Sequence, residues 1–254
     1  MSETLEAAKK FLAQCTDEER IILLDYLKER LPRHPLEQEW GVDAEIILSA
    51  ISRSSDLTKR GVRGIIAEAV FERNVLGKLA TWEAVNFADD RPYDFLIRST
   101  TLEPKQVRIQ VKLQRMRQQQ PMLASQANRH YPSEMYVVEV QKTRGGVDLQ
   151  TNEETRPYRF DEFDVLAVNM HPSTRDWDRF LYTVGNWLIP RSPNARLIEI
   201  FQPVPRIANE SWTDNLGTCL EWLASGMQRR ILDIDPKLLE RRSRKPKRRR
   251  RKKQ

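Results

Sequence analysis

The chain has 254 residues, 39% of them hydrophobic, which is enough to bury a substantial core and argues against a disordered protein. No apolar run approaches the roughly 20 residues that span a bilayer. The N-terminal MSETLEAAKK lacks the apolar centre of a signal peptide, and two distant cysteines argue against a disulfide framework or zinc finger. We therefore expect a cytoplasmic protein without a membrane partner. The formal net charge is +7, but residues 241–254 carry 11 of the 43 lysines and arginines and none of the 36 acids, which leaves the rest of the chain slightly acidic.

The first part of the chain is predicted to be helical. Residues 3–31 fit two amphipathic helices that separate at Thr16, where TDEE offers an N-cap and a Glu three residues later, the pattern of a capping box. The segment LPRHP ends this pair, and apolar residues at helical spacing predict another helix at about 42–53. We expect a helical N-terminal subdomain over residues 1–54.

A longer helix and several strands follow. The helix is predicted at about 56–79 and should pack on a sheet through one apolar stripe, formed by Val62, Ile65, Ile66, Ala69 and Leu76. Segments rich in β-branched and aromatic residues then predict strands, the first four joined by consecutive hairpins, at 82–87, 93–99, 107–116, 135–143, 163–170, 179–190 and 196–201. With a short helix near 214–225, this order predicts a mixed α/β, or α+β, fold.

Polar residues on two neighbouring strands form the candidate site. Side chains alternate along a strand, so Gln110 and Lys112 point away from Ile109 and Val111. Asp94 stands near the start of the preceding strand, and we expect it to lie beside Gln110, within reach of one cation. Taken alone, Gln110 and Lys112 also fit the solvated face of an ordinary strand, where lysine guards against aggregation.

The spacing of these residues resembles a known family. Asp94, fifteen intervening residues and then Gln110-Val111-Lys112, preceded by a helix that carries Glu68, resemble the PD-(D/E)xK nuclease superfamily, whose restriction endonucleases include members with Gln-x-Lys. The resemblance covers residues 60–145. It implies a restriction-endonuclease-like core, a mixed β-sheet flanked by helices, which we assign to residues 55–230.

The resemblance also implies a role for each residue. Asp94 would bind a divalent cation, Mg²⁺ with Mn²⁺ as a possible substitute, and Gln110 and the Val111 carbonyl would supply further oxygen ligands. Lys112 would orient or help deprotonate the attacking water. Glu68 would complete the site through the metal or a water. A hard cation with oxygen ligands neutralises the charge that develops during phosphodiester hydrolysis.

Three features depart from the family pattern or leave an alternative open. Gln110 stands where the family usually has Asp or Glu, so one negative charge is missing and weaker cation binding is expected. Tyr93 precedes Asp94 where the family has proline, and Pro92 lies one residue earlier. Glu72 lies one helical turn beyond Glu68 and is an alternative for the role assigned to Glu68.

The implied activity is hydrolysis of phosphodiester bonds in duplex DNA by a metal-dependent endonuclease of the type II restriction class. Such an enzyme would act as a homodimer, because two strands must be cut. Two alternatives stay open: a non-catalytic nucleic-acid-binding protein with a degenerate nuclease fold, and a repair or recombination nuclease.

Basic and amide side chains outside the site are candidates for DNA contacts. The candidates that follow Gln110 and Lys112 are Gln114, Arg115 and Arg117, whose side chains can reach base edges or phosphates. An ordinary polar loop would explain these residues equally well. Residues 231–254 form a predicted disordered basic tail that includes Arg248, Arg249 and Arg250 and is suited to polyanions. The tail also fits a role in solubility, localisation or association with ribosomal RNA.

Overall fold

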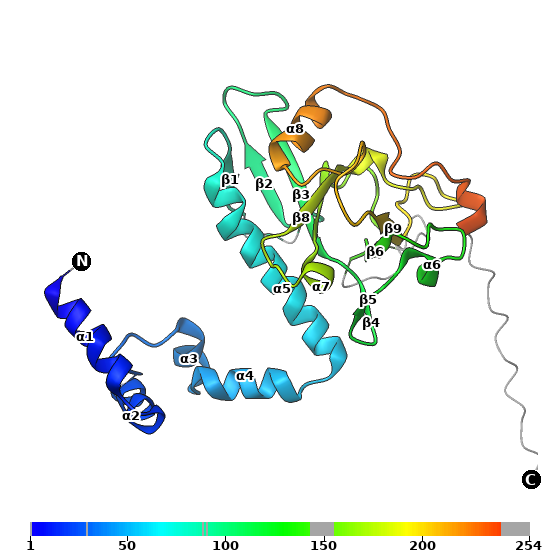
Figure 1. Ribbon diagram of the computed structural model, residues 1–254. Helices are drawn as coiled ribbons and strands as arrows, with labels where there is room; N and C mark the ends of the chain where they lie inside the picture. The colour runs from blue at the N-terminus through cyan, green and yellow to red at the C-terminus, as the bar shows by residue number, and fades with distance from the viewer. Residues whose placement is uncertain (1, 29, 88, 90, 143–154, 240–254) are drawn as a thin grey trace, which may run out of the picture. The chain divides into compact units, whose positions relative to one another are not determined.

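A computed structural model describes residues 2–28, 30–87, 89, 91–142 and 155–239 of the chain (Figure 1). The chain divides into two compact units, Met1–Arg60 and Gly61–Gln254. The division falls within helix α5, Asp56–Asn74, a few residues after the expected end of the helical subdomain.

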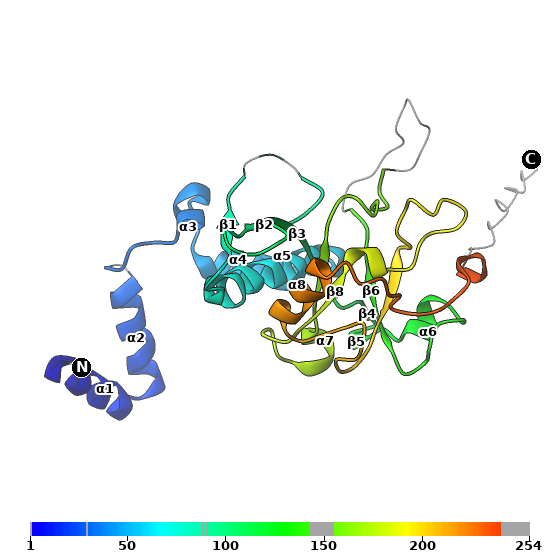
Figure 2. The same cartoon turned by 90° about the horizontal axis from the view of Figure 1, so that it is seen from above.

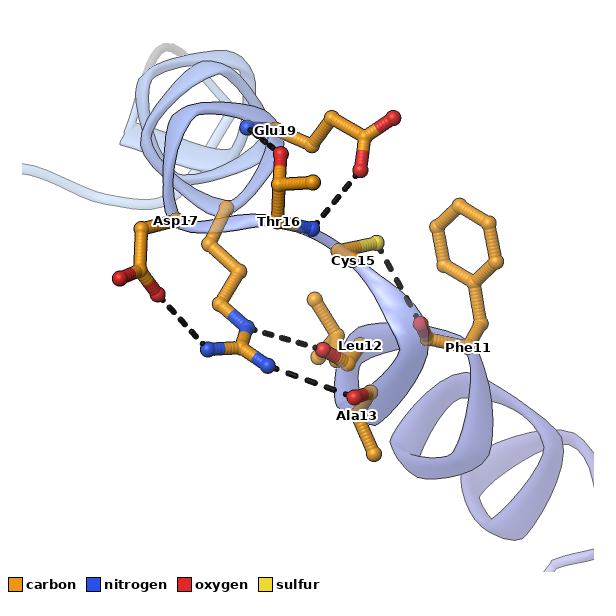
Figure 3. A network of polar contacts seen from close by, with 8 residues as sticks. Phe11, Leu12, Ala13, Cys15, Thr16, Asp17 and Glu19 are labelled. Atoms are coloured by element: carbon orange, nitrogen blue, oxygen red, sulfur yellow. Dashed lines mark hydrogen bonds and ion pairs between the residues drawn. The ribbon is translucent and has the colours of Figure 1, made fainter.

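The first unit consists of short helices with strong local capping. They are α1 (Glu3–Gln14), α2 (Asp17–Lys28), α3 (Pro35–Trp40) and α4 (Ala44–Arg53). The predicted capping box is confirmed: the Thr16 amide donates to Glu19 Oε2 at 2.8 Å and the Glu19 amide donates to Thr16 Oγ1 at 3.2 Å (Figure 3). Arg20 donates to the carbonyl oxygens of Leu12 and Ala13, so α2 satisfies acceptors at the end of α1.

The second unit is built on a mixed five-stranded sheet, so the predicted α/β class is confirmed. Its strand order is β1-β2-β3-β7-β8, with β3 and β7 parallel and the other neighbouring pairs antiparallel. The strands are β1 (Glu83–Val85), β2 (Phe95–Arg98), β3 (Gln106–Leu113), β7 (Val165–Asn169) and β8 (Phe180–Val184). Every residue of β7 and β8 is buried, which fits strands covered on both faces.

One predicted connection is wrong. Strand β6 (Tyr136–Glu139) does not continue the hairpin series beside β3 but pairs with β9 (Phe201–Val204) in a separate two-stranded sheet. The place beside β3 is taken by β7, whose five buried residues gain apolar contacts on both faces there. Beyond the end of β3, Gln114 bridges Val138, so the second sheet begins where β3 leaves the first.

Helix α5 packs along the main sheet, as expected (Figure 2). The face that it buries differs from the predicted stripe. Its buried residues are Ala67 and Phe71, and the Phe71 ring lies 5.3 Å from that of Phe95 and 5.4 Å from that of Phe180, centroid to centroid. Ile65 and Ile66 of the predicted stripe are 65% and 39% exposed, whereas Leu76 of that stripe is buried but lies in the turn after α5. The face that carries Phe71 is the buried one because burying its large aromatic ring removes more apolar surface from water than burying a neighbouring aliphatic side chain would.

The remaining elements connect or cover the sheets. They are the helices α6 (Ala124–Ala127), α7 (His171–Thr174) and α8 (Leu216–Ala224), the 3-10 turns η1 (Leu76–Lys78), η2 (Gly185–Trp187) and η3 (Pro236–Leu239), and the hairpin strands β4 (Met116–Arg117) and β5 (Gln120–Pro121). Ile231 and Leu239 are buried, so the folded unit extends past residue 230, where the basic tail was expected to begin. Among the helices that the structure describes, none combines the length and the hydrophobicity of a membrane span.

Candidate active site

Strands β2 and β3 stop pairing at Asp94, and this separation creates the site. The Asp94 amide still donates to the Ile109 carbonyl at 3.1 Å, as in an antiparallel ladder. One step further, the Val111 amide donates at 2.8 Å to Asp94 Oδ2 instead of to a carbonyl of β2. Gln110 Nε2 donates to the same carboxylate oxygen. The expected proximity of Asp94 and Gln110 is therefore present, and the carboxylate is fixed from two sides.

Gln110 is not on a solvated face. Its side chain is 0% exposed, and Nε2 also lies 3.3 Å from the Val111 carbonyl oxygen. Its Oε1 is buried and has no hydrogen-bond partner among the described residues. Buried polar atoms are nearly always paired, and an amide can exchange its oxygen and nitrogen by turning over. The site therefore holds a buried oxygen acceptor that the protein itself does not use.

Glu68 brings a second carboxyl group to this region from α5. Its pKa is raised to about 7, chiefly by burial and in addition by the negative charge of Asp94, while the ammonium of Lys112 opposes the shift. These mutual effects place the three side chains in one electrostatic cluster. Glu72, the alternative on the same helix, is exposed, so the structure brings Glu68 rather than Glu72 to the cluster.

An aromatic ring that the motif did not predict lies beside Lys112. Lys112 Nζ is 5.6 Å from the centroid of the buried Tyr158 ring, and Lys142 Nζ is 5.4 Å from the same ring. Lys142 also forms a 2.5 Å ion pair with Glu162. Sequence reasoning missed Tyr158, Lys142 and Glu162, because they come from segments far along the chain and follow no spacing that the motif defines.

The donor set suits a hard cation. Asp94, Glu68, the Val111 carbonyl and Gln110 Oε1 offer only oxygen, which Mg²⁺ and Mn²⁺ prefer over the nitrogen and sulfur ligands typical of zinc sites. Within the described residues, no group of three or more His, Cys, Asp or Glu side chains forms a ready metal site.

The candidate DNA contacts lie in different environments. Gln114 is only 1% exposed, so it is buried in the fold, and the Arg115 guanidinium forms a 3.0 Å ion pair with Glu139. Arg117 is exposed on β4 and remains open to a ligand. The predicted tail contacts Arg248, Arg249 and Arg250 lie outside the described residues.

Comparison of the chain with protein-family models, curated proteins and solved structures found no match. The functional assignment therefore depends on the residues themselves. Asp94 just before β2, Gln110 and Lys112 on β3 and Glu68 on α5 come together from three separate parts of the chain.

Proposed function

We propose that the chain is a metal-dependent endodeoxyribonuclease of the PD-(D/E)xK type that hydrolyses phosphodiester bonds in duplex DNA, as a type II restriction endonuclease does. The observation that carries this proposal is the meeting of Glu68, Asp94, Gln110 and Lys112 where β2 separates from β3. An isolated Gln-x-Lys on a strand would carry little weight, because short motifs match by chance.

Mg²⁺, with Mn²⁺ as a substitute, is the proposed cofactor. Asp94, the Val111 carbonyl and Gln110 Oε1 would hold it, with Glu68 as a further oxygen ligand or a water partner. Gln110 can offer its oxygen only when its amide turns over, because Nε2 now donates to Asp94. When bound, the cation would neutralise charge on the phosphate and lower the pKa of a water molecule.

Lys112 and Glu68 have distinct roles in this proposal. The ammonium of Lys112 stabilises the negative charge that develops on the phosphate, and preorganised charge of this kind is among the largest contributions to catalysis. Glu68 has its pKa raised to about 7, so near neutral pH it can take up a proton from the attacking water. Cutting both strands of a duplex requires two such sites, which is the reason to propose a homodimer.

One observation favours a second candidate function, a DNA-binding protein without catalysis. Gln110 removes one negative charge from the site, and its Nε2 already occupies the Asp94 oxygen that would bind the cation. If the amide stays in this orientation, the carboxylate is satisfied within the protein. Binding would then be dominated by the basic tail and would fall steeply with salt.

The experiment that tests the proposal incubates the purified full chain with a long mixed-sequence duplex, in Mg²⁺ and in EDTA, beside Asp94→Ala. Discrete fragments that need Mg²⁺ and disappear in the variant support a site-specific endonuclease. A smear with the same dependence supports a nonspecific or structure-directed nuclease of the repair class. Intact DNA across plain, branched and methylated substrates would overturn the nuclease proposal in favour of the non-catalytic one.

A further inference from the structure

A short hairpin continues directly from the strand that carries Gln110 and Lys112. Strands β4 and β5 pair in antiparallel register (Figure 1). They are joined by a turn of two residues, Gln118 and Gln119, with φ angles of 49° and 61°. Two consecutive positive φ angles are the mark of a type I′ turn, the connection that best matches the twist of a hairpin.

The residues in this turn are unusual for its geometry. Left-handed backbone is disfavoured for residues that carry a Cβ, so type I′ turns strongly prefer Asn-Gly, Asp-Gly or Gly-Gly. Residues held in disfavoured backbone conformations cluster at functional sites, so an outlier of this kind motivates a functional hypothesis. A glutamine pair at these two positions therefore points to a use for the two amides.

The base of the hairpin is rigidly held. The Arg115 amide donates to the Val137 carbonyl at 2.8 Å, and the Met122 amide donates to the Arg115 carbonyl at 2.8 Å. The ion pair between Arg115 and Glu139 fixes the same segment to β6. Contacts that discriminate between ligands need such support, because a mobile tip cannot hold a defined hydrogen-bond geometry.

The tip of the hairpin, residues 117–120, carries side chains that can form hydrogen bonds with base edges. Arg117, Gln118, Gln119 and Gln120 are all exposed, and they present three amides and one guanidinium without an acid. A glutamine amide donates and accepts at once, which matches N7 and N6 of adenine in the major groove, and a two-stranded ribbon fits that groove. Arg117 follows Lys112 by five residues, about 16 Å of extended chain, or about five base-pair steps.

We propose that the β4–β5 hairpin reads sequence in duplex DNA, with the amides of Gln118 and Gln119 binding adenine edges in the major groove a few base pairs from the proposed cutting site. This inference rests on the proposed function in taking duplex DNA as the ligand. It adds the element that discriminates between sequences and the base it prefers.

The test measures binding, so that it does not depend on cleavage. The full chain is mixed with a pool of duplexes randomised over a central segment, in EDTA and again with Ca²⁺ in place of Mg²⁺, and the bound DNA is sequenced. Wild-type protein is expected to enrich adenine at fixed positions. Gln118→Gly with Gln119→Gly suits the turn and removes both amides, and should reduce that preference roughly 5- to 150-fold. Affinity for unrelated duplex should stay the same.

Two further variants keep the test decisive. Gln106→Ala removes an exposed amide at the other end of β3 and should leave the preference unchanged. Gln118→Glu with Gln119→Glu keeps the shape of the tip but only accepts hydrogen bonds, so it should shift the preference from adenine toward cytosine.

The outcomes also separate this inference from the proposed function. Adenine enrichment that persists in both double variants, or that is missing from the wild type, would overturn the role of the hairpin whatever the cleavage assay shows. Enrichment that is lost in the glycine variant, together with intact DNA in Mg²⁺, would support the hairpin and overturn the nuclease.

Discussion

The two units of the chain obtain their structure in different ways. In the first unit, α1 to α4 bury none of their described residues, and large apolar side chains such as Ile22 and Trp40 are 68% and 57% exposed. In the second unit, β7 and β8 are buried throughout. Local capping defines the helices of the first unit, whereas long-range packing defines the sheet. The comparison predicts that substitutions act through burial in the second unit and through local hydrogen bonds in the first.

The largest expected effect is on the core beneath α5. Phe71→Ala removes a ring that is 0% exposed and contacts Phe95 and Phe180, so it should lower the free energy of unfolding by about 3 to 5 kcal/mol. Ile65→Ala on the same helix removes a side chain that is 65% exposed, and should change it by less than about 0.5 kcal/mol. Urea unfolding measures both. Equal losses would show that α5 packs through the stripe first predicted from sequence.

A second prediction concerns the charge that the site lacks. Gln110→Glu places a buried carboxylate beside Asp94 and near Glu68, and at pH 8 without metal it should cost about 3 kcal/mol of stability. Mg²⁺ should recover most of this loss, because a cation that binds only the folded state stabilises it. Thermal unfolding with and without Mg²⁺ measures the difference, and Gln106→Glu at the exposed start of β3 serves as the control. A Mg²⁺ response equal in the two variants would argue against a cation site at Gln110.

A third prediction follows from the pKa of Glu68, which is raised from an ordinary value of 4.5 to about 7. The folded state holds the proton up to about pH 7, and the unfolded chain releases it near pH 4.5, so the stability from this group is full below pH 4.5 and is lost as the pH rises through 7. Glu68→Gln stays neutral, so without metal it should gain about 1 to 2 kcal/mol over wild type by pH 8, after solvent screening of a partly buried group, and nothing near pH 4.5. Urea midpoints across this range give the answer, and a constant difference between the two proteins would contradict it.

The smallest expected effect lies in the helical unit. Thr16→Ala removes the N-cap of α2 and should destabilise that helix by about 1 kcal/mol. Hydrogen exchange of α2 amides should speed up while exchange in β7 and β8 stays unchanged. Ser49→Ala, an exposed position within α4, is the control. Faster exchange in the sheet would show that the two units unfold together.

Sequence patterns predicted what is determined locally. The Thr16–Glu19 capping box lies within four residues, and the strand containing Gln110 was found from its own alternation. Asp94 could be placed beside Gln110 because a hairpin connects their strands, which fixes the pairing once both are identified.

The parts that were missed depend on contacts between distant segments. No local pattern shows that β7 rather than β6 lies beside β3, since this is settled by which strand can be buried on both faces. Glutamine is usually found at the surface, so the sequence does not predict that Gln114 is buried. In the structure it is buried and pairs with Val138, which is distant in the sequence. The contact between Tyr158 and Lys112 likewise joins segments that are distant in the sequence.

The most direct test of the nuclease proposal compares the rates at which two lysine variants cleave duplex DNA in Mg²⁺. Lys112→Ala removes the ammonium of the site, whereas Lys105→Ala removes an exposed one seven residues earlier and changes the net charge equally. The proposal predicts at least a roughly 100-fold loss for Lys112→Ala, with unchanged thermal stability and DNA affinity, and a wild-type rate for Lys105→Ala. Equal cleavage by the two variants would contradict the assignment of this site.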